Sequence, residues 1–343
     1  MMNNQNKFVG VDLGGTHLRA AIVDSVTGVI SGFKQIPTQA YEGHDAVIVR
    51  MTGLIQEVIA SDGTSKGQVG GVGIGVPGVV DLDRGWVKFV PNLPDNWRDV
   101  PLCQAIEERV DLPTHLLNDA RSMTFGEWKF GGGRGVQTMA CFTLGTGIGG
   151  GLIINGKLHM GTGDVAAELG HQTIDFNGPR CGCGNHGCVE AFASGPAIAA
   201  MGVKAVMQGL TTNIGEMVNH DLNRITPKVI YQAAMDGDKI AQEIFELAGY
   251  YIGIAVGNVL VSVGPRKVVI GGGVSQAGDL LLDPIRRTVG QRGSMVLVDQ
   301  VQIVLAELGT NAGLVGAALW AKEQIQGNNR SPAMGWRCEE SGD

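Results

Sequence analysis

Short apolar runs that end in glycine recur along this chain. The run 8–13, FVGVDL, is followed by the polar turn 14–16, GGT, and by a second apolar run, 18–24. This order predicts two strands joined by a glycine turn. It differs from a Walker loop and from a Rossmann fingerprint, because in both of those the glycine-rich turn opens a helix.

The same unit occurs again about one domain later. The apolar run 139–144 leads into the glycine-rich segment 145–151, and the run after it ends at Asn155-Gly156, a dipeptide typical of hairpin turns. Both hairpins carry glycine and threonine at the tip. Two such units indicate a duplicated domain that holds a ligand between its halves.

Strand and helix patterns alternate through the rest of the chain, which favours an α/β architecture. The runs 69–81 and 267–274 are predicted strands that end in glycine-rich turns. Apolar periodicity predicts helices over 44–59, 228–261 and 312–325.

One helical stretch, 248–263, is apolar enough to suggest a membrane span. It is short for that purpose, and Gly249, Gly253 and Gly257 lie four residues apart on one helix face. We therefore predict a buried helix that packs closely on its neighbours, and no contact with a membrane.

Composition and charge limit the possible partners. The net charge of the 343 residues is −7 and no basic cluster occurs, which argues against nucleic acid as a partner. The N-terminus has no basic segment followed by an apolar one, so we predict no signal peptide. Six cysteines in a chain of this size, without a signal peptide, argue against a disulfide framework and favour a cytoplasmic protein.

Three of the six cysteines crowd into eight residues and predict a metal site. Cys181, Cys183 and Cys188 would supply three thiolates, and one histidine would complete a tetrahedral Cys₃His site for Zn²⁺. Such a site has no open position, so the zinc would be structural. His186 lies inside the loop but very near Cys188, and three buried or redox-active cysteines are the alternative interpretation.

Six short motifs occur in an order that is typical of one protein family. They are DLGGT at 12–16, PG at 77–78, NDA at 118–120, LGTGIGGG at 144–151, ELGH at 168–171 and CGCGNHGCVE at 181–190. With these motifs the chain resembles the ROK-family sugar kinases from about residue 8 to residue 325, and among them the bacterial glucokinases. The resemblance implies an actin-like ATPase fold of the hexokinase and Hsp70 type, with two similar α/β domains around a nucleotide cleft.

On that fold we expect a small N-terminal domain at 1–117 and a large domain with the zinc site at 118–311. A last helix at about 312–326 is expected to return to the first domain. Residues 327–343 are polar and turn-rich, so we expect a disordered tail there. The resemblance also implies a homodimer.

The resemblance assigns ATP to the two glycine hairpins. Glycine lets backbone N–H groups approach phosphate oxygens, and a threonine hydroxyl adds a donor. Asp12 would hold Mg²⁺ directly or through water. His17 stands where many family members have lysine, which leaves open where a cationic phosphate contact comes from. The nucleotide-binding candidates, with the adenosine side last, are Asp12, Gly14, Gly15, Thr16, His17, Gly145, Thr146, Gly147, Gly149, Gly150, Gly271, Gly272, Gly273 and Asn311.

Asp119 is the candidate general base. A kinase needs a carboxylate that accepts the proton of the attacking hydroxyl, and the resemblance gives this role to Asp119 and sugar binding to Asn118. Taken locally, the pair is also a good N-cap for a helix that begins at Ala120. One aspartate can cap that helix and still point its second oxygen at a substrate.

The remaining sugar contacts are expected from carboxylate, imidazole and backbone groups. Glu168 and His171 are three residues apart and would share one face of a helical turn. The resemblance makes His171 the fourth zinc ligand as well, so that the metal would hold Glu168 and Glu190 at the sugar. Surface charge is the alternative role for each carboxylate. The full set is Gly78, Asn92, Asn118, Asp119, Glu168, His171 and Glu190.

Several alternatives stay open. Glucose is the preferred acceptor because 91–102 resembles the segment of ROK glucokinases that carries a sugar-binding asparagine. N-acetylmannosamine, N-acetylglucosamine, mannose, fructose and allose are other acceptors, and polyphosphate is another donor. The family also contains repressors with a helix-turn-helix domain before the DxGGT motif. Here only eleven residues precede Asp12, and they contain no basic cluster, which argues against DNA binding. A non-catalytic sugar sensor would lack an intact phosphate site.

Overall fold

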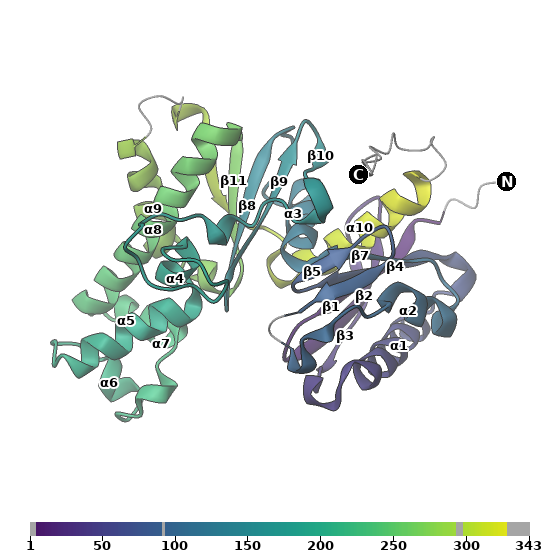
Figure 1. Ribbon diagram of the computed structural model, residues 1–343, viewed down its shortest axis with the longest axis horizontal. Coiled ribbons are helices and arrows are strands. Elements are labelled where there is room, and N and C mark those ends of the chain that lie inside the picture. Colours follow the sequence, from purple (N-terminus) through teal and green to yellow (C-terminus); the bar gives the residue numbers. More distant parts are fainter. Residues whose placement is uncertain (1–4, 91–92, 293–297, 328–343) are drawn as a thin grey trace, which may run out of the picture.

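The two predicted glycine hairpins belong to two five-stranded sheets of identical topology. The computed structural model describes residues 5–90, 93–292 and 298–327 (Figure 1). The first sheet, in spatial order, contains β3 (Ile30–Pro37), β2 (His17–Asp24), β1 (Lys7–Leu13), β4 (Val69–Val76) and β7 (Thr114–Asn118). The second contains β10 (Lys157–Leu158), β9 (Ile148–Ile154), β8 (Met139–Leu144), β11 (Lys267–Gly271) and β12 (Gln302–Leu305). In each sheet three antiparallel strands are followed by two strands parallel to the central one.

The helices repeat in the same order around the two sheets. Those of the first half are α1 (His44–Ser61), α2 (Leu102–Val110) and α3 (Asp119–Phe130), and their counterparts in the second half are α8 (Lys239–Val263), α9 (Asp279–Arg292) and α10 (Ala312–Gly327). The second half also contains α4 (Val189–Ala193), α5 (Gly195–Met207), α6 (Ile214–Met217) and α7 (Pro227–Met235), and the first a small hairpin of β5 (Val79–Asp81) and β6 (Trp86–Phe89). The predicted α/β duplication is therefore confirmed.

Each half has its own buried apolar core, and a third cluster joins them. This third cluster includes Phe8 of β1, Phe125 of α3 and Met139 of β8, so that it spans both sheets. Helix α10 packs on β1 and β4 of the first half, whereas α3 packs on β9 of the second. Because α3 follows the first sheet but contacts the second, the domain boundary at 117/118 stays a proposal.

Helices α3 and α10 touch each other where the two halves join (Figure 1). A Cβ atom on Gly316 of α10 would lie 1.6 Å from the carbonyl oxygen of Ser122 in α3. A Cβ atom on Gly126 of α3 would lie 2.4 Å from the carbonyl oxygen of Ala312. Glycine at both positions lets the two helix backbones come into direct contact.

The predicted single helix over 228–261 is wrong, because the chain forms α7 and α8 with a break between them. Gly237 has a φ of 93° at the break, a conformation that favours glycine. Asp238 then caps α8, and its side chain accepts a hydrogen bond from the Ala241 N–H at 3.0 Å. The turn chemistry interrupts an otherwise continuous apolar pattern.

Helix α8 is long and apolar enough to cross a membrane, but most of its apolar stretch is buried inside the protein. Gly249 and Gly253 lie against Pro284 and Thr288 of α9, where a Cβ atom would come within 2.6 Å of either side chain. The expected close packing is present at these two glycines. It is absent at Gly257, where a Cβ atom would meet nothing within 4 Å.

Gly316→Ala is expected to destabilise the protein by about 1–3 kcal/mol, because its methyl group would force α3 and α10 apart. The midpoint of urea unfolding measures this change. Gly257→Ala is the matched control, since it places the same methyl group on a helix in open space. The control is expected to leave stability unchanged or to raise it by up to about 1 kcal/mol. Equal midpoints for both variants would contradict the proposed backbone contact.

Candidate active site

The carboxyl ends of β1, β4 and β7 bring three predicted site segments to one edge of the first sheet. Asp12 in β1 pairs with Gly75 in β4, and Gly75 pairs with Leu117 in β7. Asp12 and the Asn118-Asp119 pair therefore end neighbouring parallel strands on the same side. The Pro77-Gly78 turn follows β4 between them, and the Asn118 side-chain N–H donates to the Gly78 carbonyl oxygen at 3.1 Å.

Helix α3 begins at Asp119, one residue earlier than predicted, and its cap is Asn118. The Asn118 Oδ1 atom accepts hydrogen bonds from the N–H groups of Ala120 at 3.0 Å and Arg121 at 3.2 Å. Asp119 Oδ1 accepts only a bond from the Ala120 N–H, at 2.8 Å. The prediction that Asp119 caps the helix is thus wrong, since Asn118 does so. The Asp119 Oδ2 atom accepts no hydrogen bond from the described residues.

Burial among protein atoms raises the pKa of Asp119 to about 7. The negative charges of Asp12 and Glu168 raise this pKa further, while the Ala120 N–H and the Arg121 charge oppose the shift. The Asp119 side chain nevertheless keeps access to solvent, so a ligand can reach it. The sheet edge thus presents an accessible carboxylate that titrates near neutral pH.

Asp12 is buried, with 9% of its surface exposed, and this burial raises its pKa. Arg19 opposes the shift by its charge and by a hydrogen bond to the Asp12 carboxylate. The same guanidinium donates to the carbonyl oxygen of Thr310 at 3.0 Å. Arg19 was not among the predicted residues, although it follows His17 by two positions and so lies on the same face of β2. A cation therefore lies beside this turn despite the replacement of lysine by His17.

Glu168 is held beside the start of α3 by Arg121, which is only 2% exposed. The Arg121 Nη2 atom lies 3.0 Å from Glu168 Oε1, and its Nε atom donates to the Ala166 carbonyl oxygen at 3.1 Å. Glu168 directly precedes the short 3₁₀ turn Leu169–His171, and its carbonyl oxygen accepts a hydrogen bond from the His171 N–H at 3.0 Å. Arg121 was not among the predicted residues, since its partners lie about 45 positions away and no local pattern marks it.

The first glycine turn leaves its backbone open to solvent. The Gly14 N–H donates to the His17 carbonyl oxygen at 3.0 Å, and the Thr16 carbonyl oxygen accepts from the Thr38 N–H at 2.9 Å. Gly15, Thr16 and His17 are exposed. The predicted phosphate-binding backbone is therefore accessible.

The second glycine turn joins β8 and β9, and the Gly271–Gly273 turn lies beside it. The Gly145 N–H donates to the Gly147 carbonyl oxygen at 2.9 Å. Gly272 has a φ of 86°, and a Cβ atom there would lie 2.4 Å from the carbonyl oxygen of Leu144. The structure thus brings these two predicted nucleotide segments together. Of the other candidates, Thr146 is exposed at the tip, Gly149 and Gly150 lie in β9, and Asn311 ends the 3₁₀ turn Gly309–Asn311 directly before α10.

The three clustered cysteines and His171 converge as a set of four metal ligands. One ligand atom from each lies within 4.8 Å of all the others. Cys183 Sγ lies 3.8 Å from Cys188 Sγ, and Cys181 Sγ lies 3.7 Å from His171 Nδ1. Thiolates bound tetrahedrally to one zinc ion at about 2.3 Å would be about 3.8 Å apart. The donor set and its spacing fit a Cys₃His zinc site, and His186 is not part of it.

Glu190 connects this cysteine cluster to the second glycine turn. Its Oε2 atom accepts a hydrogen bond from the Ile148 N–H at 2.8 Å, and its Oε1 atom lies 3.5 Å from Cys181 Sγ. A Cβ atom on Gly147 would lie 2.4 Å from Glu190 Oε2. Glu190 therefore positions the turn and also lies beside Cys181 of the candidate metal site. Asn92, the remaining sugar candidate, lies outside the described residues, as does the predicted tail beyond residue 327.

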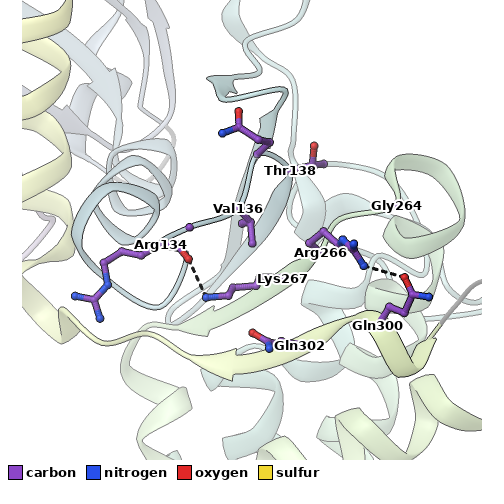
Figure 2. Close-up of a pocket in the computed structure, with 10 residues that line it drawn as sticks. Arg134, Val136, Thr138, Gly264, Arg266, Lys267, Gln300 and Gln302 are labelled. Atoms are coloured by element: carbon purple, nitrogen blue, oxygen red, sulfur yellow. Dashed lines mark hydrogen bonds between the residues drawn. The ribbon is translucent and has the colours of Figure 1, made fainter.

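A separate depression of about 760 Å³ lies at the amino ends of β8, β11 and β12. Figure 2 shows Arg134, Thr138, Arg266 and Lys267 around it. The glycine turns end these same strands at the opposite, carboxyl edge. This depression is therefore not part of the candidate active site.

Comparison with known proteins identifies the family. The sequence model of the ROK family matches residues 8–324. The chain belongs to the ROK family. It is 38% identical over 328 residues to the glucokinase of Streptomyces coelicolor. The match covers 92% of this chain and 97% of that protein. A xylose repressor of Caldicellulosiruptor bescii is 31% identical, over 90% of this chain and 76% of the repressor.

A solved structure supports the same assignment. The ROK family glucokinase from Streptomyces griseus, crystallised in complex with glucose and AMPPNP, is 35% identical with a TM-score of 0.81. The match covers 92% of this ROK protein and 99% of the Streptomyces griseus chain. This similarity confirms the actin-like ATPase fold expected from the sequence.

Asp119→Asn is expected to stabilise this ROK protein against urea at pH 8 and to have little effect near pH 4. An unfolded aspartate has a pKa of about 4, whereas burial raises that of native Asp119 to about 7. The native charge therefore lowers stability progressively as the pH rises from about 4 to about 7. Unfolding midpoints at several pH values measure the effect.

Asp24→Asn is the control with the opposite sign. Hydrogen bonds from the N–H groups of Thr27 and Val26 hold the pKa of Asp24 below its usual value. The carboxylate contributes stability above pH 4 that is lost as the pH falls. This variant should therefore unfold more easily at pH 8. If Asp119→Asn were also destabilising at pH 8, the raised pKa of Asp119 would be wrong.

Proposed function

We propose that this ROK protein transfers the terminal phosphoryl group of ATP to the 6-hydroxyl of glucose, giving glucose 6-phosphate and ADP. The observation that carries the proposal is the position of Asp119. It lies accessible at the start of α3, at the same sheet edge as Asp12 and beside Glu168, with a pKa near 7. Membership of the ROK family and the similarity to glucokinases support the reaction type.

Asp119 would act as the general base. The sugar oxygen attacks the γ-phosphorus, the bond from that phosphorus to the β–γ bridging oxygen breaks, and the hydroxyl proton passes to the Asp119 carboxylate. Oδ1 is occupied by the Ala120 N–H, so Oδ2 would take the proton. A pKa near the working pH leaves a large ionised fraction while keeping the carboxylate basic enough to accept a proton.

The sugar would be bound by groups that surround Asp119. Asn118 is fixed by its bond to Gly78 and Glu168 by its pairing with Arg121, so both are held rigidly next to the base. His171, Glu190 and Asn92 complete the proposed set by resemblance to the family. Such preorganised polar groups orient the reacting hydroxyl.

The nucleotide would be held by the two glycine turns, which have exposed residues at their tips and could offer backbone N–H groups to phosphate oxygens. Asp12 would hold Mg²⁺ directly or through water, and such an ion would supply positive charge that offsets the charge of the phosphates. The charge of Asp12, which raises the pKa of Asp119, fits a site that receives a divalent cation. Gly271–Gly273 and Asn311 would contact the adenosine.

Other acceptors and another class of protein remain as alternatives. Mannose, fructose, allose, N-acetylglucosamine and N-acetylmannosamine share most of the hydroxyls that such a site would bind, and polyphosphate could replace ATP. The similarity to a xylose repressor favours, as the second candidate, a sugar sensor without catalysis. Such a sensor would bind sugar but release no ADP.

A panel of these hexoses, assayed with ATP or polyphosphate and Mg²⁺ for ADP or phosphate-ester formation, tests the proposal. Glucose with ATP is expected to give the highest kcat/KM. Asp119→Asn should lower kcat by about 10²–10⁴-fold with little change in glucose affinity, since only proton acceptance is lost. For the native protein, kcat/KM should fall as the pH drops below about 7. Wild-type turnover in the variant would reject Asp119 as base, and glucose binding without ADP release would favour the sensor.

We further propose that His171, Cys181, Cys183 and Cys188 bind a structural zinc ion. The closed set of four ligands leaves no position for a substrate. Through His171 and Glu190 the metal would steady both the Glu168 turn and the second glycine turn. The zinc would then take no part in phosphoryl transfer, but it would fix the positions of active-site residues.

Cys183→Ser is expected to lose zinc and stability together, because metal binding stabilises the fold that brings the ligands together. Elemental analysis and the thermal midpoint of the purified variant measure both. Cys103→Ser, which changes another free cysteine outside the cluster, should keep its zinc. A Cys183→Ser protein with native zinc content, or one without zinc and with native stability, would contradict the proposal.

We also propose a cytoplasmic homodimer. The location is supported by the cysteine usage of the chain, which suits a reducing compartment. The dimer is supported only by the resemblance to the family. Sedimentation of the purified protein would establish its oligomeric state.

A further inference from the structure

Glu127, in the last turns of α3, is a completely buried carboxylate that has no cationic partner among the described residues. Its exposed fraction is 0%, and within residues 5–90, 93–292 and 298–327 no lysine, arginine or histidine forms an ion pair with it. Three backbone N–H groups bind it instead. Oε2 accepts from Gly132 at 2.8 Å and Glu307 at 3.0 Å, and Oε1 accepts from Leu308 at 2.8 Å. Such charge-assisted bonds compensate for the loss of water around the carboxylate.

These donors belong to two segments that are far apart in the chain. Gly132 lies in the loop that follows α3, and Lys267 of β11 ties this loop down by donating to the carbonyl oxygens of Gly132 and Arg134. Figure 2 shows the bond between Lys267 and Arg134. Glu307 and Leu308 lie in the connection from β12 to α10. Glu127 therefore joins α3 to the chain that enters α10.

That connection leads directly to the proposed nucleotide side of the site. Leu308 precedes the 3₁₀ turn Gly309–Asn311, and the carbonyl oxygen of Thr310 in this turn accepts a hydrogen bond from Arg19. Arg19 in turn pairs with Asp12. A continuous set of polar contacts thus runs from Glu127 through residues 307–310 to Asp12. The other end of the same helix α3 carries Asp119.

We propose that Glu127 is a positioning residue for the nucleotide. Its carboxylate fixes residues 307–311 against α3 and thereby sets the place of the nucleotide relative to Asp119. The inference rests on the proposed function and adds a residue that contacts neither substrate. A glutamine in its place has a single carbonyl oxygen and an NH₂ group, so at least one of the three N–H groups would face another donor. Because the released segment lies on the nucleotide side, ATP binding is affected more than sugar binding.

Glu127→Gln is expected to raise KM for ATP by about tenfold, while KM for glucose and kcat at saturating ATP change by less than about twofold. Calorimetric binding of AMPPNP should weaken by the same factor, and this readout does not depend on turnover. Asp238→Asn is the matched control. Asp238 is also buried and binds the N–H groups of Ala241 and Asn213, but it caps α8, outside the proposed site. It should lower stability and leave nucleotide affinity unchanged.

Unchanged affinity for AMPPNP and ATP in Glu127→Gln would overturn the proposal, and so would an equal loss for ATP and glucose. Glu127→Asp provides a second variant that keeps the charge, should the glutamine variant fold poorly. Its shorter side chain cannot span both segments, so it should weaken AMPPNP binding as well. A native protein without kinase activity would reject the proposed function instead, and the AMPPNP measurement would still decide the role of Glu127.

Discussion

The structure depends on the direct contact between the backbones of α3 and α10. Glycine at positions 126 and 316 allows this contact, because any side chain there would collide with a carbonyl oxygen of the other helix. One helix packs on each sheet, so their crossing sets how the duplicated halves face each other. Asp119 begins α3 and Asp12 lies against the first turn of α10, where a Cβ atom on Gly313 would lie 3.8 Å from Asp12 Cγ. The helix contact thus determines the relative position of the two carboxylates.

Charge at this site is arranged so that a base can work near neutral pH. Asp12, Asp119 and Glu168 place three carboxylates close together, and burial with mutual repulsion raises the pKa of Asp119. Arg19 pairs with Asp12 and Arg121 pairs with Glu168, and among the described residues no arginine forms an ion pair with Asp119. Each flanking carboxylate thus has an arginine beside it, while the central carboxylate stays basic and accessible. This division of partners suits proton acceptance in phosphoryl transfer.

The cysteine cluster and Glu127 steady different parts of the same site. Glu190 links the cysteine loop to the second glycine turn, because its carboxylate accepts a hydrogen bond from the Ile148 N–H. Glu127 links α3 to the segment that precedes α10, because its carboxylate accepts hydrogen bonds from the N–H groups of Glu307 and Leu308. Neither contact touches a reacting atom in the proposed mechanism. Both use a carboxylate that accepts backbone N–H groups, which fixes the geometry of loops that have few side chains to pack.

The sequence by itself determined the strands, the glycine turns, the duplication and the clustered cysteines, because strand patterns, turn residues and ligand spacing are local properties. Only the tertiary structure decided which polar side chains meet. Arg121 and Glu127 find partners up to 181 positions away, so no pattern within a window of sequence marks them. It also decided that Asn118 caps α3, and that Oδ2 of Asp119 accepts no hydrogen bond from the part of the chain that the structure describes. Which polar groups meet depends on how strands and helices are placed beside one another. Tertiary packing determines that placement, and local sequence preference does not.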